Sequence, residues 1–367
     1  MTANYEVYIS NKAGERVAQV TAFTTLEMVR RFNTVGSWYI TADAAALAEL
    51  TTQGGIMVYR NGVLFFTGSV NAFEDVSGLT ITANGSDDLD MIAGLLALPV
   101  PGGAPYNVDY DVRTGIAETV IKQYVNLNAG PGAISIRRVG GLTIETDNGR
   151  GGQATGRARF EKLIDLIRSL AVQGGNIGFR ILAGQFGIYI PTDKSDTIIF
   201  SKELGTLGDY RFSTKRGEEN ALYIGGAGTG SARTIYEMSD PTAVVDWGRR
   251  EAFLDKGNTS DATELAAAGA EELAKKSGET ILTITPMPTA LMQPIDNYDI
   301  GDWVKAVIRG QVIKQQVREI KTTLSSTGES NELAIGTEGA STDTTGLAGI
   351  YSRMRGLDKR VNTMERR

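Results

Sequence analysis

The chain has 367 residues, with 37 Lys and Arg against 43 Asp and Glu for a formal net charge of −6, and it contains neither cysteine nor histidine. This length allows two or three domains with separate cores. The two missing residue types exclude disulfides, thiolate and imidazole metal ligands, and Ser–His or Cys–His catalysis, and the acidic balance without a long Lys/Arg run argues against nucleic-acid binding by counterion release.

Residues 1–104 are expected to form a first β domain. Asn61-Gly62 stands between two β-rich arms and predicts a type I′ hairpin turn, because both turn residues need positive φ. A second hairpin is predicted around Ser77-Gly78. Ser86 is then expected to cap a short helix that stops at Pro99.

Residues 105–205 have the pattern of an α/β insert. Apolar residues spaced three and four apart predict helices at about 114–127 and 160–172. A glycine-rich loop at 149–156 lies between the helices, and a hairpin is predicted at 177–190.

Residues 206–335 are expected to form a second β domain with one inserted helix. Asp261 and Glu264 have the spacing of a capping box at the start of that helix. A long hairpin is predicted to turn at Arg309-Gly310.

After a flexible linker at 336–346, residues 347–367 predict a coiled-coil helix that joins copies of this chain. The seam has Leu347, Met354 and Val361 at a positions and Ile350, Leu357 and Met364 at d positions. In a parallel bundle the pairs Arg353 with Asp358 and Arg360 with Glu365 attract between chains, and Leu at a beside Ile at d favours three or four strands. The alternative is an amphipathic helix that folds back on its own domain.

No membrane segment is expected. No apolar run approaches the roughly 20 residues of a membrane span, and the N-terminus lacks the basic and then apolar pattern of a secretory signal. We therefore expect the protein to stay where it is made until it is assembled.

Two glycine-rich stretches are similar to nucleotide-binding loops but lack essential residues. Gly151 to Ala158 has Arg157 and Ala158 where a phosphate-binding loop needs Lys and Ser/Thr. Gly225 to Gly230 lacks the third glycine of a dinucleotide fold at the required spacing. Both are predicted to be loops, and no cofactor is expected.

Two groups of aspartates are candidate metal ligands. Asp87, Asp88 and Asp90 stand at a predicted helix start, where carboxylates favour the helix dipole, so capping is the preferred interpretation. Asp296, Asp299 and Asp302 share one loop, but calcium-loop spacing needs a ligand where Tyr298 stands, so at most a weak calcium site is expected. We predict no metal site and no catalytic residue.

Several short motifs, in this order, resemble the tail hub (baseplate hub or tail-tip) proteins of long non-contractile-tailed bacteriophages, the siphophages, and more distantly the baseplate hubs of contractile tails. Asn61 to Gly68 and Asn220 to Gly226 are similar to that family's hairpin and its strand into a glycine-rich loop. The family-like residues are Gly248, Arg249, Arg250 and Glu251 of a Gly-Arg-Arg-Glu segment, and Tyr298, Gly301, Asp302 and Val304 of a Tyr-x-x-Gly-Asp-x-Val turn.

The resemblance implies an α+β, mostly β fold with two β-barrel-like tube domains, and a structural virion protein rather than an enzyme. A homotrimer would offer six similar modules, adapting a sixfold tail tube to a threefold tip. The implied partners are the distal tail or tail tube protein, the tape measure protein, a tip fibre or spike protein, and DNA that passes without sequence-specific binding. The implied location is the distal end of the tail in the virion, after synthesis in the host bacterial cytoplasm.

Two alternatives remain open. A trimeric adhesin-like, carbohydrate-binding tail-tip protein would need exposed aromatic side chains in a groove. A carboxylate glycosidase needs neither His nor Cys, but it requires two carboxylates that face each other in a cleft.

Overall fold

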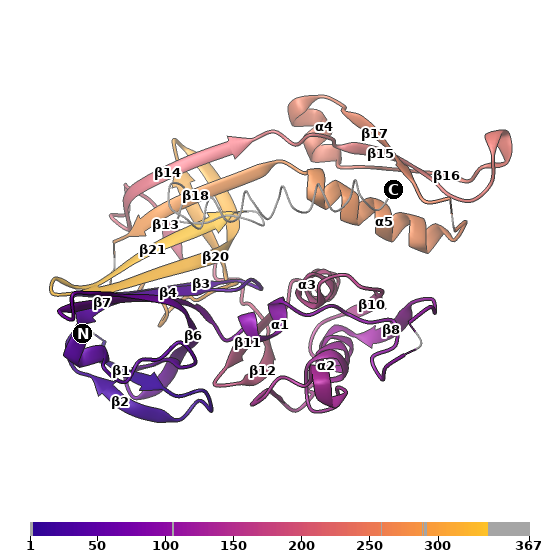
Figure 1. Cartoon of the computed structure of the whole chain (residues 1–367). Helices are drawn as coiled ribbons and strands as arrows, with labels where there is room; N and C mark the ends of the chain where they lie inside the picture. The colour runs from indigo at the N-terminus through magenta and orange to yellow at the C-terminus, as the bar shows by residue number, and fades with distance from the viewer. Residues whose placement is uncertain (1–2, 105, 258, 288, 290–291, 337–367) are drawn as a thin grey trace.

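The computed structural model describes residues 3–104, 106–257, 259–287, 289 and 292–336. More of these residues lie in strands than in helices, 44% against 17%, so the fold is α+β and mostly β. In Figure 1 the large sheet lies on the left, the insert at the lower right, and a small unit containing α4 and α5 above the insert.

The strands of the large sheet come from both ends of the chain. They are β1 (Tyr5–Ser10), β2 (Arg16–Val20), β3 (Thr25–Arg31), β4 (Ser37–Asp43), β5 (Gly55–Arg60), β6 (Val63–Val76), β7 (Thr80–Asp87), β13 (Ile199–Phe200), β14 (Leu207–Lys215), β18 (Glu279–Pro286), β19 (Trp303–Ile308), β20 (Gln311–Ser325) and β21 (Gly328–Gly336). Their order is β14-β18-β21-β20-β3-β4-β7-β6-β5-β1-β2, with β19 also on β20 and β13 on β19.

Three smaller sheets and five α-helices complete the described chain. The strands are β8 (Asp111–Ile116) with β10 (Gln153–Ala158), β9 (Thr143–Ile144) with β11 (Gly178–Leu182) and β12 (Gln185–Tyr189), and β15 (Ala221–Gly225) with β16 (Ile235–Ser239) and β17 (Glu251–Asp255). The helices are α1 (Asp90–Ala93), α2 (Ala117–Asn128), α3 (Leu163–Gln173), α4 (Pro241–Trp247) and α5 (Ala262–Lys276), with 3-10 turns at Ala44–Leu47, Ser135–Arg137 and Gly230–Ala232.

The two β regions share one 13-stranded sheet. β20 pairs antiparallel with β3 from Glu319 opposite Arg31 to Ser325 opposite Thr25. The predicted pair of β-barrel-like domains is not confirmed, since in the described ranges the sheets stay open and none closes into a hydrogen-bonded barrel. The reason is that β20 offers its free edge to β3, so the sheet continues from one region into the other.

The predicted turns are present. Asn61 and Gly62 have φ of 52° and 77°, and Arg309 and Gly310 have φ of 52° and 76°, as two-residue hairpins require. Asp261 caps α5 by accepting the amide protons of Thr263 and Glu264. These features are local, so neighbouring residues alone are sufficient to predict them.

Other predicted boundaries shift because strand pairing extends further than the residue pattern indicates. Ser86 does not cap a helix: it lies in β7, opposite Ser37 of β4. The helix expected at 114–127 begins only at Ala117, since the preceding residues pair with β10. β10 itself takes up Gln153–Ala158 and so part of the expected glycine-rich loop.

The three aspartates at the start of α1 differ in role. Asp90 lies in the first turn of α1, and Asp87 accepts the Leu89 amide proton at 3.1 Å. Asp88 does not cap, because its carboxylate accepts the hydroxyl proton of Thr67 at 2.6 Å and the amide proton of Gly184 at 3.2 Å.

Four hydrophobic clusters stabilise the parts of the fold. They centre on Trp38 and Ile40 in the first β region, on Tyr124 and Phe186 in the insert, on Phe200 and Val304 in the second β region, and on Leu222 and Ile224 under α5. Leu89 and Ile92, which precede residue 105, pack in the insert cluster. The domain limits given above stay predictions.

The β3–β4 turn joins the sheet to the insert through one buried amide. Asn33 has φ of 53° and is 3% exposed. Its Nδ2 donates to the Ile177 carbonyl at 2.9 Å and its Oδ1 accepts the Phe179 amide proton at 2.8 Å. Arg168 of α3 donates to the Asn33 carbonyl at 3.1 Å. The Asn33 side chain thus makes the backbone hydrogen bonds at Ile177 and Phe179 that a neighbouring strand would otherwise make.

We predict that Asn33→Gly lowers the free energy of unfolding by about 2–4 kcal/mol, because two buried backbone groups lose their partners while the positive φ stays permitted. Urea denaturation followed by circular dichroism measures the change. Asn61→Gly is the matched control, since Asn61 also has positive φ but is exposed. Equal losses in the two variants would contradict the role of the Asn33 amide.

Candidate functional site

The predicted oligomerisation seam from Leu347 to Met364 and its inter-chain ion pairs lie outside the described residues. The coiled coil therefore stays a prediction. The motifs of the second β region lie within the described residues, and they locate two features: a turn that joins the β regions and a small sheet with an open face.

Tyr298 to Val304 forms the turn that leads into β19. The Tyr298 ring is fully buried, edge-on to Phe200 with ring centroids 5.6 Å apart. Gly301 has φ of 92°, and a Cβ on it would lie 2.7 Å from the ring of Phe32, so glycine is required. Val304 is fully buried in the second β core. The turn therefore holds β19 close to the end of β3.

The three aspartates of this loop pair with separate bases and do not converge. The ion pairs are Asp296 with Arg60 at 2.6 Å, Asp299 with Arg30 at 2.7 Å and Asp302 with Lys194 at 2.9 Å. The two arginine pairs are bidentate, which fixes orientation as well as distance. A calcium site gains no support, and within the described ranges no group of three or more carboxylates is placed to hold a metal.

The Gly-Arg-Arg-Glu segment connects α4 to β17. Gly248 has φ of 74° and ends α4. Arg249 forms ion pairs with Glu237 at 2.5 Å and with Glu251 at 2.6 Å, all on the surface. Arg250 donates to a backbone carbonyl at 2.9 Å. The segment is thus an exposed, charge-neutralised cluster that has no catalytic arrangement.

The sheet β16-β15-β17 has an open face that sequence reasoning missed. α5 packs against one face through Leu265. Ile235 and Phe253, 53% and 55% exposed, lie on the strand positions that alternate with the residues under α5. Val245 and Trp247 of the neighbouring α4 are 84% and 48% exposed. The sheet therefore carries exposed apolar side chains on the face opposite α5.

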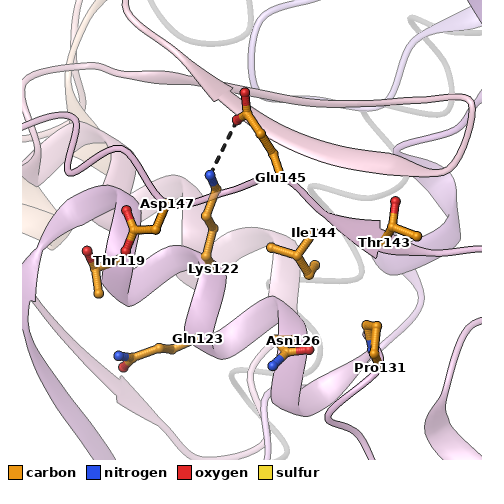
Figure 2. A pocket seen from close by; sticks show the side chains of 9 residues that line it. All are labelled: Thr119, Lys122, Gln123, Asn126, Pro131, Thr143, Ile144, Glu145 and Asp147. Atoms are coloured by element: carbon orange, nitrogen blue, oxygen red, sulfur yellow. Dashed lines mark hydrogen bonds and ion pairs between the residues drawn. The ribbon is translucent and has the colours of Figure 1, made fainter.

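The insert has a depression of about 440 Å³. It is lined by Thr119, Lys122, Gln123, Asn126, Pro131, Thr143, Ile144, Glu145 and Asp147 (Figure 2). Lys122 donates to Glu118 at 2.6 Å, to the Thr146 carbonyl at 2.7 Å and to Glu145 at 3.3 Å. All three ammonium protons are used in these hydrogen bonds, so Lys122 has a structural role.

Glu118 is the central acceptor of this hydrogen-bond network. It is fully buried, and besides Lys122 it accepts the backbone amide protons of Asn148 at 3.2 Å and Arg150 at 2.7 Å. One carboxylate therefore holds the loop at residues 146–150 against α2.

The carboxylates that line the depression are both held ionised. Burial by itself would raise the pKa of Glu145, but hydrogen bonds from Arg150, the Ile188 amide and Lys122 outweigh it and lower the pKa. The Thr119 hydroxyl lowers the pKa of Asp147. A glycosidase needs one carboxyl with a raised pKa as general acid, so neither residue supports that alternative.

Comparison with solved structures identifies the fold as that of prophage tail proteins. The 43 kDa tail protein of prophage MuSo2 from Shewanella oneidensis matches with a TM-score of 0.58 and 16% identity, over 90% of this chain and 98% of that one. Prophage tail protein gp18 from Listeria monocytogenes EGD-e matches with a TM-score of 0.59 and 13% identity, over 96% of this chain and 99% of that one. The tail protein from Neisseria meningitidis MC58 matches with a TM-score of 0.53 and 13% identity, over 92% and 97%.

At the sequence level, the model of the Siphovirus ReqiPepy6 Gp37-like protein family matches residues 6–337, and the chain belongs to this family. The predicted resemblance to a siphophage tail protein family is thereby confirmed. No curated protein matches the sequence. In the part of the chain that the structure describes, no helix is long and apolar enough to cross a membrane.

We predict that Glu118→Gln lowers the free energy of unfolding by about 2–4 kcal/mol, since it leaves the Lys122 charge buried without its main partner. Urea denaturation measures it, and Glu49→Gln, at an exposed position, is the control. The double variant Glu118→Gln with Lys122→Met should recover part of the loss, because the unpaired charge is then gone. Additive losses in the double variant would contradict the pairing.

Proposed function

We propose that this chain is a trimeric tail hub that closes or extends the tail tube at the distal end of a siphophage tail. The main support is the family match over residues 6–337. The structural matches to the three tail proteins also cover at least 90% of this chain. The role is structural, without catalysis, and its location is the distal tail of the virion.

Symmetry gives the mechanism. Each chain carries two β regions, 1–104 and 206–335, so a trimer has six similar modules around one axis and three copies of everything else. Such a ring matches a sixfold tube on one side and a threefold fibre or spike on the other. The β20–β3 pairing supports this arrangement, because it holds the two modules of a chain at one relative angle.

The proposed tube domains would close between chains. The outermost strands of the large sheet, β14 and β2, each have a single neighbour in the sheet. An unpaired strand edge is a template for pairing with another chain. We infer that barrel-like closure is a property of the assembled ring, with the coiled coil at 347–367 beyond the linker holding the three chains in register.

The passage would admit the tape measure protein and then DNA. A formal net charge of −6 disfavours adhesion to phosphates, since fixed Lys and Arg side chains would retain them. Surface arginines of the small sheet are already neutralised: Arg233 pairs with Asp255 and Arg249 with Glu237. The tail tube or distal tail protein and a tip fibre are the proposed neighbours above and below.

One observation favours the alternative of a carbohydrate-binding, adhesin-like tail-tip trimer. Tyr106 and Tyr110 of the insert are each 40% exposed. The guanidinium groups of Arg157 and Arg159 lie 4.9 and 5.6 Å from the Tyr110 ring centroid. Exposed tyrosines can stack on sugar rings, and specific binding on a glycan array that Tyr106→Ala with Tyr110→Ala abolishes would favour this function.

Negative-stain electron microscopy of the purified protein tests the hub. We expect end-on class averages with threefold symmetry and a central hole. Light scattering on the same sample gives the mass of the oligomer. Compact particles without a pore, at concentrations where the protein is oligomeric, would contradict the passage and leave the adhesin as the better proposal.

We predict that Leu357→Asp raises the trimer dissociation constant at least about tenfold, which corresponds to about 1.4 kcal/mol, because it places a charge in the seam. Ser352→Asp, outside the a and d positions, is the control and should leave the mass unchanged. Light scattering across a dilution series measures both. An unchanged mass for Leu357→Asp would indicate that the body of the protein holds the oligomer without the coiled coil.

A further inference from the structure

The open face of the β16-β15-β17 sheet carries an apolar strip, while α5 lies along the other face (Figure 1). Ile235 of β16 and Phe253 of β17 are 53% and 55% exposed on this face. Gly225 of β15 pairs with Ile235, and a Cβ on Gly225 would lie 2.5 Å from Cζ of the Phe253 ring. The ring therefore crosses over the glycine toward β16, and the two side chains form one surface.

Charged side chains frame the open face without covering it. They are Glu237, Glu251, Asp255, Arg233 and Arg249, with a formal net charge of −1. Arg233 pairs with Asp255, and Arg249 pairs with both glutamates. The Arg233 guanidinium lies 5.2 Å from the Phe253 ring centroid, yet more than half of Phe253 stays exposed. The open face is thus apolar along its middle and charged at its edges.

Helix α4 adds two exposed apolar side chains beside the sheet. Asn220, directly before β15, donates from Nδ2 to the Ala243 carbonyl at 3.1 Å and to the Gly248 carbonyl at 2.8 Å, which attaches α4 to the start of that strand. Val245 and Trp247 of α4 are 84% and 48% exposed. Covering these side chains, together with those of the open face, is favourable because it removes apolar surface from water.

The end of the described chain lies close to this small unit, residues 216–278. Gly336, the last described residue, pairs with Ile281 of β18, and β18 begins at Glu279, directly after the unit. The next ten residues, 337–346, span at most about 33–36 Å when extended, and a compact unit of this size has a radius of gyration of about 11 Å. Residues 347–367 are therefore tethered within reach of the small unit of their own chain.

The tethered residues match the small unit in pattern and in charge. The six seam residues from Leu347 to Met364 would form one apolar stripe on a helix, which is how an amphipathic helix recognises an apolar surface. Residues 347–367 hold six Lys and Arg against two Asp and Glu, a formal net charge of +4. Residues 216–278 hold seven against eleven, a formal net charge of −4. The opposite charges attract the two parts before the apolar surfaces meet.

We propose that in an unassembled chain residues 347–367 dock as an amphipathic helix on the open face of the same chain, and that they leave it for the coiled coil when three chains meet. The seam cannot face both partners, so the two states exclude each other. The tether favours docking at low protein concentration, because dilution weakens trimerisation but not contact within one chain. The docked state is independent of the hub function, and only the release rests on it.

Paramagnetic broadening in the full-length chain tests the docked state. The chain has no cysteine, so a nitroxide on Ser352→Cys, outside the a and d positions, labels one place only. At a dilution where light scattering gives the mass of one chain, the methyl signals of Ile235 should broaden, and those of Ile9, buried in the first β region, should not. A chain that stays trimeric at every dilution, or an unbroadened Ile235 in the monomer, would overturn the docked state.

A mixed sample tells docking within a chain from docking between chains. Chains with ¹³C-labelled methyl groups and no nitroxide are mixed with unenriched chains that carry it. The Ile235 signal of the labelled chains should then stay sharp in the monomer. Broadening in this mixture would show that another copy supplies the helix, and it would overturn docking within one chain.

Phe253→Asp tests the competition between docking and assembly. It should abolish the broadening of Ile235 and lower the apparent dissociation constant of the trimer at least about tenfold, because no seam is then covered. Leu79→Asp, at a side chain that is 74% exposed on the β6–β7 turn, is the matched control and should change neither. Val245→Asp repeats the test outside the sheet where Phe253→Asp folds poorly.

The two measurements separate this inference from the hub. A monomer that shows the broadening but never trimerises would contradict the hub and support the docked state. A trimer whose dissociation constant is the same in wild type, Phe253→Asp and Val245→Asp would overturn the release and leave the hub standing.

Discussion

The structure depends on the hydrogen bonds of β20, a 15-residue strand. One of its edges pairs with β21, and the other pairs first with β19 and then with β3. Buried backbone groups must find partners, so β19, β21 and β3 are positioned by the same strand. The first and second β regions therefore form one sheet, and neither can rotate without breaking the β3–β20 ladder.

Charged side chains then fix the angle between the two regions. Arg31 of β3 pairs at 2.6 Å with Glu319, whose side chain is fully buried, and Arg30 forms a bidentate pair with Asp299. Burying ions costs solvation free energy, so such pairs contribute orientation more than stability. The insert is attached differently, through the Asn33 amide and the Asp88 carboxylate. The two β regions are thus joined by a continuous strand ladder, whereas side-chain hydrogen bonds join the insert to the sheet.

Sequence reasoning located the family-like residues but not what they do in the fold. The sequence marks Tyr298 and Gly301 as motif residues, and the structure adds that the ring fills the second β core and that the glycine makes room for Phe32. The loop spacing makes Asp299 a candidate metal ligand, whereas in the structure it pairs with Arg30. Arg30 and Asp299 are 269 residues apart, so no local pattern predicts that pairing. The open sheet face with Phe253 was likewise missed, because alternation alone does not say which face another element covers.

The sequence by itself determined the local features and the chemistry that is excluded. The hairpin at Asn61-Gly62 and the Asp261 cap of α5 depend only on neighbouring residues, and a chain without His or Cys has no imidazole or thiolate chemistry in any fold. Only the tertiary structure decided that the two β regions share one sheet and that Asp299 pairs with Arg30. The physical reason is that strand register and the burial of charged groups depend on residues far away in sequence. These residues come into contact only when the chain folds.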